Sequence, residues 1–221
     1  MKKLFQAIQQ NDIETVKKLI ENDTALVNCV AKQPPKKDDG QSPLQVSLKN
    51  GNLEIAEYLI DMGADVNFIE DVSCCNVWRV PVIHDAINAS VMNCRWNINE
   101  SSGVKVFSTE QNAKKAYSVL KKMLDLGADI NATDSYGNSG IWRFCLQASQ
   151  ILPSCDYGAQ CERNDRIFTK DLEDDLYNIL SLLCESGADF YYNSPNMNCS
   201  VLDLYRDGSL AKLLRRALNA D

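Results

Sequence analysis

One pentapeptide, present in three copies, constrains this chain more than any other feature. Gly-Ala-Asp-Val-Asn occupies residues 63–67, Gly-Ala-Asp-Ile-Asn occupies 127–131 and Gly-Ala-Asp-Phe-Tyr occupies 187–191, at intervals of 64 and 60 residues. Each copy follows an apolar run, at the place where a glycine in the left-handed conformation commonly ends a helix. Such self-similarity predicts a fold assembled from stacked copies of one supersecondary unit.

The stretch 37–67 shows what that unit contains. Ser42-Pro43 is typical of a helix start, with a serine N-cap and a proline at the first helical position. Gly51-Asn52 ends this short helix, and apolar residues then recur at helical spacing until Gly63. The predicted unit is a turn, a short helix, a tight turn, a second helix and a terminating glycine.

This segment resembles the ankyrin repeat, whose first helix carries G-x-T-P-L-H-x-A-A and whose second helix ends in G-A-D-V-N. The chain has G-Q-S-P-L-Q-V-S from Gly40 and departs from the family at Gln45, where the family has histidine. The resemblance implies an all-α solenoid of stacked helix-turn-helix pairs with short hairpin-like turns. We expect one ankyrin-repeat domain over 1–221, with approximate repeats 1–34, 35–68, 69–132, 133–192 and 193–221.

The third and fourth repeats exceed the usual ankyrin length of about 33 residues. We therefore expect an insertion between the two helices of each, and we expect the two insertions to be neighbours. Thr109 and Thr169 each precede a terminating glycine by 18 residues and are predicted to cap lengthened second helices. When the two lengthened helices are aligned at Thr109 and Thr169, Lys114-Lys115 falls at the positions of Asp174-Asp175. This placement predicts ion pairs between adjacent second helices.

The resemblance also implies a non-enzymatic module that binds another protein through its hairpin tips and the exposed face of its first helices. Trp78 and Tyr136 are either interface anchors or side chains that pack on a neighbouring repeat, and the sequence leaves both interpretations open. Carried over by position, the expected partner-binding residues are Asp38, Asp39, Gln41, Lys49, Asn50, Trp78, Arg79, Asn88, Ser135, Tyr136, Asn138 and Gln147.

The insertions offer a second expected surface. Long loops in compact domains are often functional, so they are either a partner-binding loop or a small core that shields the lengthened helices. The aromatic residues concerned are Trp96, Phe107, Tyr157 and Phe168.

The net charge indicates the class of partner, and the cysteine content bears on metal binding and on the cellular compartment. Thirty acidic residues against 23 basic ones give a net charge of −7, which disfavours nucleic acid and anionic membranes and suits a basic protein. Nine cysteines without a Cys-x-x-Cys pair, and a single histidine, argue against zinc. We expect most of the cysteines to be buried thiols in a reducing compartment. We expect that compartment to be the cytoplasm, because no signal peptide or membrane span is evident. A redox role for Cys74-Cys75 stays open.

No cofactor is expected, since the phosphate-binding pattern G-x-x-x-x-G-K-[ST] is absent from the sequence. An enzyme that uses His84 with a cysteine is a remote alternative. The acidic run 171–175 is either a metal cluster or a solvated helix start, which the helix dipole favours. The leading hypothesis is a monomer that masks or inhibits one basic protein, for example an immunity protein that neutralises a toxin. The alternative is a host-directed or regulatory ankyrin adaptor.

Overall fold

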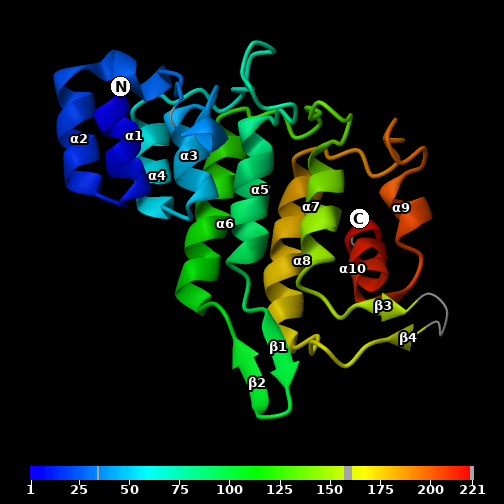
Figure 1. Cartoon of the computed structure of the whole chain (residues 1–221). Helices are drawn as coiled ribbons and strands as arrows, with labels where there is room; N and C mark the ends of the chain where they lie inside the picture. The colour runs from blue at the N-terminus through cyan, green and yellow to red at the C-terminus, as the bar shows by residue number, and fades with distance from the viewer. Residues whose placement is uncertain (34, 157–160, 220–221) are drawn as a thin grey trace.

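The computed structural model describes residues 1–33, 35–156 and 161–219 (Figure 1). Within these ranges ten α-helices follow one another in five pairs. Two 3-10 helices, η1 (Thr24–Asn28) and η2 (Lys36–Asp38), lie between the first pairs. The pairs are α1 (Lys2–Gln9) with α2 (Ile13–Asn22), α3 (Pro43–Lys49) with α4 (Leu53–Asp61), α5 (Val82–Met92) with α6 (Glu110–Asp125), α7 (Gly140–Ala148) with α8 (Lys170–Glu185), and α9 (Val201–Leu204) with α10 (Gly208–Leu218).

The pairs stack into two rows of helices. The first helices contact one another in the order α1, α3, α5, α7 and α9, and the second helices in the order α2, α4, α6, α8 and α10. Figure 1 shows the rows side by side, with the loops that join consecutive pairs along one edge. This arrangement confirms the predicted all-α solenoid. The exact residue boundaries of the repeats stay a prediction.

The helix starts follow the sequence signals. Ser42 accepts the N–H of Gln45 while the Gln45 side chain accepts the N–H of Ser42, so the two form a capping box. Thr109 caps α6 and Thr169 caps α8, as predicted. Both helices have 16 residues, against nine in α4. The third and fourth pairs therefore extend beyond their neighbours at the end away from the connecting loops.

The asparagine in the pentapeptide explains why the sequence is repeated. Asn67 donates through Nδ2 to the carbonyl of Gly127 at 3.0 Å, and its Oδ1 accepts the N–H of Asp129 at 2.8 Å. The same pair of bonds is made by Asn28 and by Asn131 to the copies that follow them. One side chain thus joins each copy to the next copy's backbone. The series stops at Tyr191, which stands at the asparagine position and is 70% exposed.

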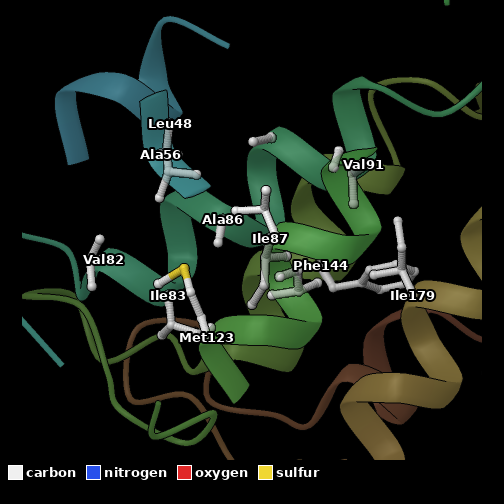
Figure 2. Packing of buried hydrophobic residues seen from close by; sticks show 14 of the residues in the cluster. Leu48, Ala56, Val82, Ile83, Ala86, Ile87, Val91, Met123, Phe144 and Ile179 are labelled. Carbon is white, nitrogen blue, oxygen red and sulfur yellow. The ribbon is translucent and has the colours of Figure 1, made fainter. Parts of the chain in front are cut away.

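The core fills the space between the two rows. Trp142 and Phe144 of α7 are its largest fully buried side chains. Figure 2 shows Ile83 and Met123 close together and Phe144 beside Ile179, so α5, α6, α7 and α8 share this core. Gly140 begins α7 where a Cβ atom would collide with the carbonyl oxygen of Ile130. A glycine at this position therefore lets α7 approach the preceding loop closely.

Each insertion contains a pair of antiparallel strands, which the sequence did not predict. Strand β1 (Asn97–Glu100) pairs antiparallel with β2 (Gly103–Val106), and β3 (Cys155–Asp156) with β4 (Cys161–Glu162). The insertions are neighbours, as expected: Asn97 Nδ2 donates to the carbonyl of Ile167 at 2.8 Å, and Asn99 N–H donates to the carbonyl of Asp165 at 2.9 Å. The expected surface residue Tyr157 lies outside the described residues.

The predicted ion pairs between 114–115 and 174–175 are wrong. Lys115 instead pairs with Glu57 of α4. Asp175 pairs with Arg95 at 2.7 Å, because the first insertion places that guanidinium beside α8. Among the described helices, none is both long and apolar enough to cross a membrane.

Candidate functional site

The loop tips are bonded to one another along the edge of the stack. The tip of the second unit meets that of the third where Asp39 accepts the N–H of Cys75 at 2.9 Å. The third meets the fourth where Ser135 N–H donates to the carbonyl of Arg79 at 3.0 Å, and Arg79 N–H donates to Ser135 Oγ at 3.1 Å. The Tyr192 hydroxyl then donates to the carbonyl of Gly137. Side chains on these tips are consequently held in fixed relative positions.

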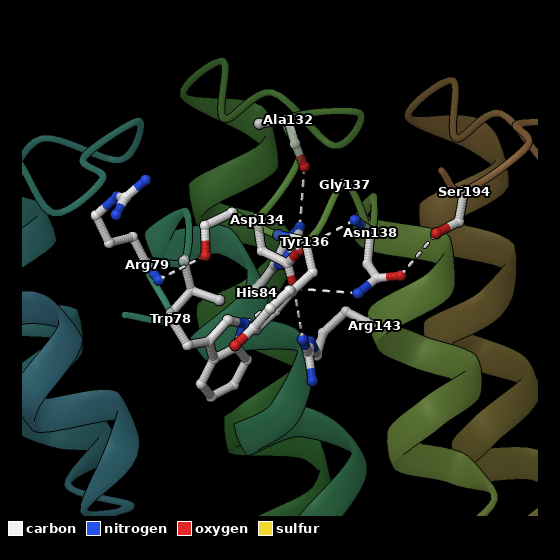
Figure 3. A network of polar contacts seen from close by, with 12 residues as sticks. Trp78, Arg79, His84, Ala132, Asp134, Tyr136, Gly137, Asn138, Arg143 and Ser194 are labelled. Carbon is white, nitrogen blue, oxygen red and sulfur yellow. Dashed lines mark hydrogen bonds and ion pairs between the residues drawn. The ribbon is translucent and has the colours of Figure 1, made fainter. Parts of the chain in front are cut away.

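Asp134 organises the centre of this edge (Figure 3). Its buried carboxylate accepts the indole N–H of Trp78 at 3.0 Å, the guanidinium of Arg143 at 2.9 Å and the backbone N–H of Tyr136 at 2.9 Å. Burial opposes ionisation, but the hydrogen bonds outweigh it and hold the pKa of Asp134 below its usual value. Trp78 therefore packs on the neighbouring unit and stays 39% exposed, while Tyr136 is 49% exposed.

The predicted partner-binding residues fall into three groups in the structure. Exposed on the tips and helix ends are Lys49, Asn50, Trp78, Ser135 and Tyr136. Half-buried are Asp39, Arg79, Asn88 and Gln147. Buried are Asp38, Gln41 and Asn138. Asp38 accepts a hydrogen bond from the Gln9 side-chain amide, and Asn138 Oδ1 accepts one from the Ser194 hydroxyl. Both residues therefore already have partners within the stack. We call the exposed group the tip surface.

A pocket of about 500 Å³ opens within the tip surface, between α3 and Trp78. The buried side chain of Gln41 lines it, and its Oε1 accepts no hydrogen bond. The remaining lining residues are Lys37, Asp38, Lys49, Asn50, Asn76, Val77 and Trp78. We call this the tip pocket.

Two buried carboxylates lie behind the Lys49 ammonium. Glu70 Oε1 is 3.7 Å and Asp85 Oδ2 is 3.9 Å from Lys49 Nζ, and neither oxygen accepts a hydrogen bond. Burial raises the pKa of Asp85 to about 7, Lys49 and Arg143 lower it, and Glu70 raises it further. Sequence reasoning missed this pair. The available signal was Asp85 itself, an acid directly after the family's histidine position on a first helix.

The position of the family's histidine is occupied by different residues that make one kind of contact. Each donates from its side chain to a backbone carbonyl in the loop of the next unit, which ties the units together. These contacts are Gln45 to Val80 at 2.9 Å, His84 to Ala132 at 3.0 Å and Trp142 to Tyr192 at 3.3 Å. Burial lowers the pKa of His84 to about 4, so its ring is neutral near pH 7 and Nε2 carries the donated proton.

The insertion aromatics pack mainly on one another. Trp96 stacks on Phe107 with ring centroids 4.2 Å apart, and Lys105 Nζ lies 5.0 Å from the Phe107 ring centroid. Phe168 is half-buried against the core. Phe107 remains 40% exposed. Both earlier interpretations of this surface, a shielding core and a binding loop, remain compatible with this packing.

The cysteines depart from expectation. Among the cysteines whose side chains are described, only Cys94 and Cys145 are buried. Burial and the nearby Asp39 raise the pKa of Cys75, which disfavours its reactive thiolate. The acidic run at the start of α8 contacts Arg95 through Asp171 at 3.0 Å. In the described ranges, no group of three or more His, Cys, Asp or Glu residues is placed to hold a metal ion.

Comparison with known proteins shows a similarity to ankyrin repeats over part of the chain. The sequence model of the ankyrin repeats, in three copies, matches residues 3–90. This match covers 88 of the 221 residues and, together with the two-row helix stack, supports the predicted resemblance to the ankyrin-repeat family. It is similar to a protein of Rickettsia bellii (strain RML369-C) whose name describes it as an ankyrin repeat protein, with 28% identity over 134 residues. That alignment covers 59% of this chain and 18% of the relative, so the chain spans under a fifth of the relative's length.

Proposed function

We propose that this chain is a protein-binding module whose tip surface contacts the partner. Ankyrin repeats are typical of protein–protein interaction, and stacked units offer an extended surface without needing chemistry. The observation that carries the proposal is the pair Trp78 and Tyr136, two half-exposed aromatics on bonded tips. Large side chains that are already held in place lose little conformational entropy on binding, which favours them as interface anchors.

The tips support this choice over the rest of the molecule because their geometry is fixed before binding. Asp134 bonds the Trp78 indole and the Tyr136 backbone at once, so one buried carboxylate holds the Trp78 side chain and the backbone position from which the Tyr136 side chain projects. The insertion surface around Phe107 is the second candidate. It is favoured by the exposed valines of β2, Val104 at 47% and Val106 at 54% exposure.

Within this proposal, a masking or inhibitory role toward a basic protein remains the narrower hypothesis. The excess of acidic residues motivates it, because an acidic surface attracts a basic partner. An immunity protein that neutralises a toxin is one form of it, and a regulatory or host-directed adaptor is the alternative. If this chain inhibits the activity of its purified partner, that result supports the masking or immunity role over the adaptor.

Affinity capture with matched variants tests the proposal. The tagged chain is compared with a double variant, Trp78→Ala with Tyr136→Ala, in extracts of the cell that produces it. The control carries Leu126→Ala with Tyr191→Ala, which removes exposed apolar side chains (57% and 70% exposed) that are not part of the tip surface. We expect a stoichiometric partner that the tip variant loses and the control keeps. A partner kept by the tip variant, with its melting temperature intact, would overturn the assignment.

A further inference from the structure

We infer that the tip pocket receives an arginine side chain of the protein partner, whose guanidinium group contacts the acceptors at and behind its floor. This inference rests on the proposed function, since the arginine is supplied by the bound protein. It specifies one contact within the tip surface, and three features of the pocket carry it: unfilled acceptors, an excess of carboxylates, and an aromatic wall.

The first feature is a set of buried oxygens that lack donors. Gln41 Oε1, Glu70 Oε1 and Asp85 Oδ2 each accept no hydrogen bond, and the three residues are 4%, 3% and 3% exposed. Buried acceptors are normally bonded, because an unfilled one costs free energy. With Asp85 ionised, all three need the same complement, an N–H donor. A guanidinium presents five such donors in a rigid planar fork.

The second feature is charge. Asp38 lines the pocket, and Glu70 and the ionised form of Asp85 lie behind Lys49, against the ammonium groups of Lys37 and Lys49; the nearby Arg143 guanidinium is already paired with Asp134. Lys49 Nζ stays 3.7 Å or more from both acids behind it, beyond hydrogen-bond length. The site is therefore only partly neutralised by its own cations. A cationic guest completes the neutralisation, whereas an anionic guest would face the carboxylates.

The third feature is the aromatic wall. Trp78 lines the pocket, and the Arg143 guanidinium already lies 4.8 Å from its ring centroid. Guanidinium groups stack on indole rings more readily than ammonium groups do. The volume of the tip pocket, about 500 Å³, lies in the size range of ordinary ligand sites. Because the Lys49 ammonium lies at ion-pair distance but not at hydrogen-bond distance from the two acids, the geometry favours a guest arginine over a guest lysine.

A titration of the whole chain tests this without the partner. N-acetyl-arginine amide is added while the indole N–H resonance of Trp78, assigned with Trp78→Phe, is followed by NMR. N-acetyl-citrulline amide has nearly the same shape without the charge, and N-acetyl-lysine amide and N-acetyl-glutamate amide test the other guests. We expect saturable binding of the arginine probe, with the citrulline probe at least about 10-fold weaker, which corresponds to about 1.4 kcal/mol, and the lysine probe weaker than arginine.

Variants make the test specific. Glu70→Gln keeps an acceptor for the Val80 N–H, which Glu70 now bonds at 2.7 Å, but removes the charge, and should weaken arginine binding several-fold. Lys49→Met should strengthen it by removing the competing ammonium. Asp125→Asn, on an exposed acid of α6 paired with Lys121, should leave it unchanged.

Several results would overturn the inference. They are the absence of a saturable shift, equal binding of arginine and citrulline probes, preferred binding of the glutamate probe, or weaker arginine binding in Lys49→Met. A partner captured through the tip surface alongside a null titration would overturn the arginine pocket alone. If no partner is captured through the tip surface and the titration is also null, the proposed function is overturned as well.

Discussion

Replacing Asn67 by alanine should destabilise the stack by breaking the link between two copies of the pentapeptide. The Asn67 side chain donates to Gly127 at 3.0 Å and accepts from Asp129 at 2.8 Å, so alanine removes both bonds together. An intramolecular hydrogen bond contributes about 0.5–1.5 kcal/mol net, which gives about 1–3 kcal/mol for two. Because Asn67 is exposed and water can replace part of the loss, we expect about 1–2 kcal/mol.

The assay is urea unfolding followed by circular dichroism, with thermal unfolding beside it. For a chain of this size, 1 kcal/mol corresponds to about 2–4 °C in melting temperature. Tyr191→Ala is the internal control, because it changes the same position of the pentapeptide in a copy where the side chain is 70% exposed and replaces the bonding asparagine. We expect its free energy of unfolding to change by less than about 0.5 kcal/mol.

The comparison refutes the reasoning if Asn67→Ala is as stable as the Tyr191→Ala control. That result would mean that water satisfies Gly127 and Asp129 as well as the asparagine does. The pentapeptide would then require another explanation than inter-unit bonding. Asn131→Ala, which breaks the equivalent bonds to Gly187 and Asp189, should repeat the effect of Asn67→Ala.

Three further predictions concern pH, capping and the core. Since burial raises the folded-state pKa of Asp85 from 3.8 to about 7, the folded state binds more protons between these values. The free energy of unfolding should therefore fall as pH rises from about 4 to about 7, by up to about 1.4 kcal/mol per unit, and Asp85→Asn should remove that slope in urea titrations. Thr109→Ala should cost about 1 kcal/mol by removing the cap of α6, measured by urea unfolding; a loss below about 0.3 kcal/mol would contradict it. Phe144→Ala, at a fully buried site, should cost about 3–5 kcal/mol in the same assay, and a smaller loss would mean that the core closes over the cavity.

Local signals in the sequence were sufficient to predict where the helices begin and end. Ser42-Pro43 and Thr109 mark helix starts by capping chemistry, and Gly63 marks an end by its positive φ of 86°. These effects act within a few residues, so they can be recognised without knowing what packs nearby. The family resemblance then supplied the two-row arrangement, which no single repeat encodes alone.

The insertions and the tip pocket depend on contacts between distant residues. Strand β1 is Asn-Ile-Asn-Glu, a composition poor in strand formers, and it is held by side-chain bonds from Asn97 and Asn99 to the second insertion. Arg95 lies 80 residues from Asp175 in sequence, which no spacing rule connects. The acids Glu70 and Asp85 likewise become a pair only when Lys49 lies beside both.

Site-specific photo-crosslinking in the native cell tests the central claim most directly. A photoreactive amino acid is placed at Tyr136 on the tip surface, at Val104 on β2, or at Leu126 at the end of α6, all exposed positions. Our account predicts a discrete protein adduct from position 136, with its yield lowered by Trp78→Ala, and none from position 126. An adduct from position 104 or 126 without one from 136 would contradict binding through the tip surface.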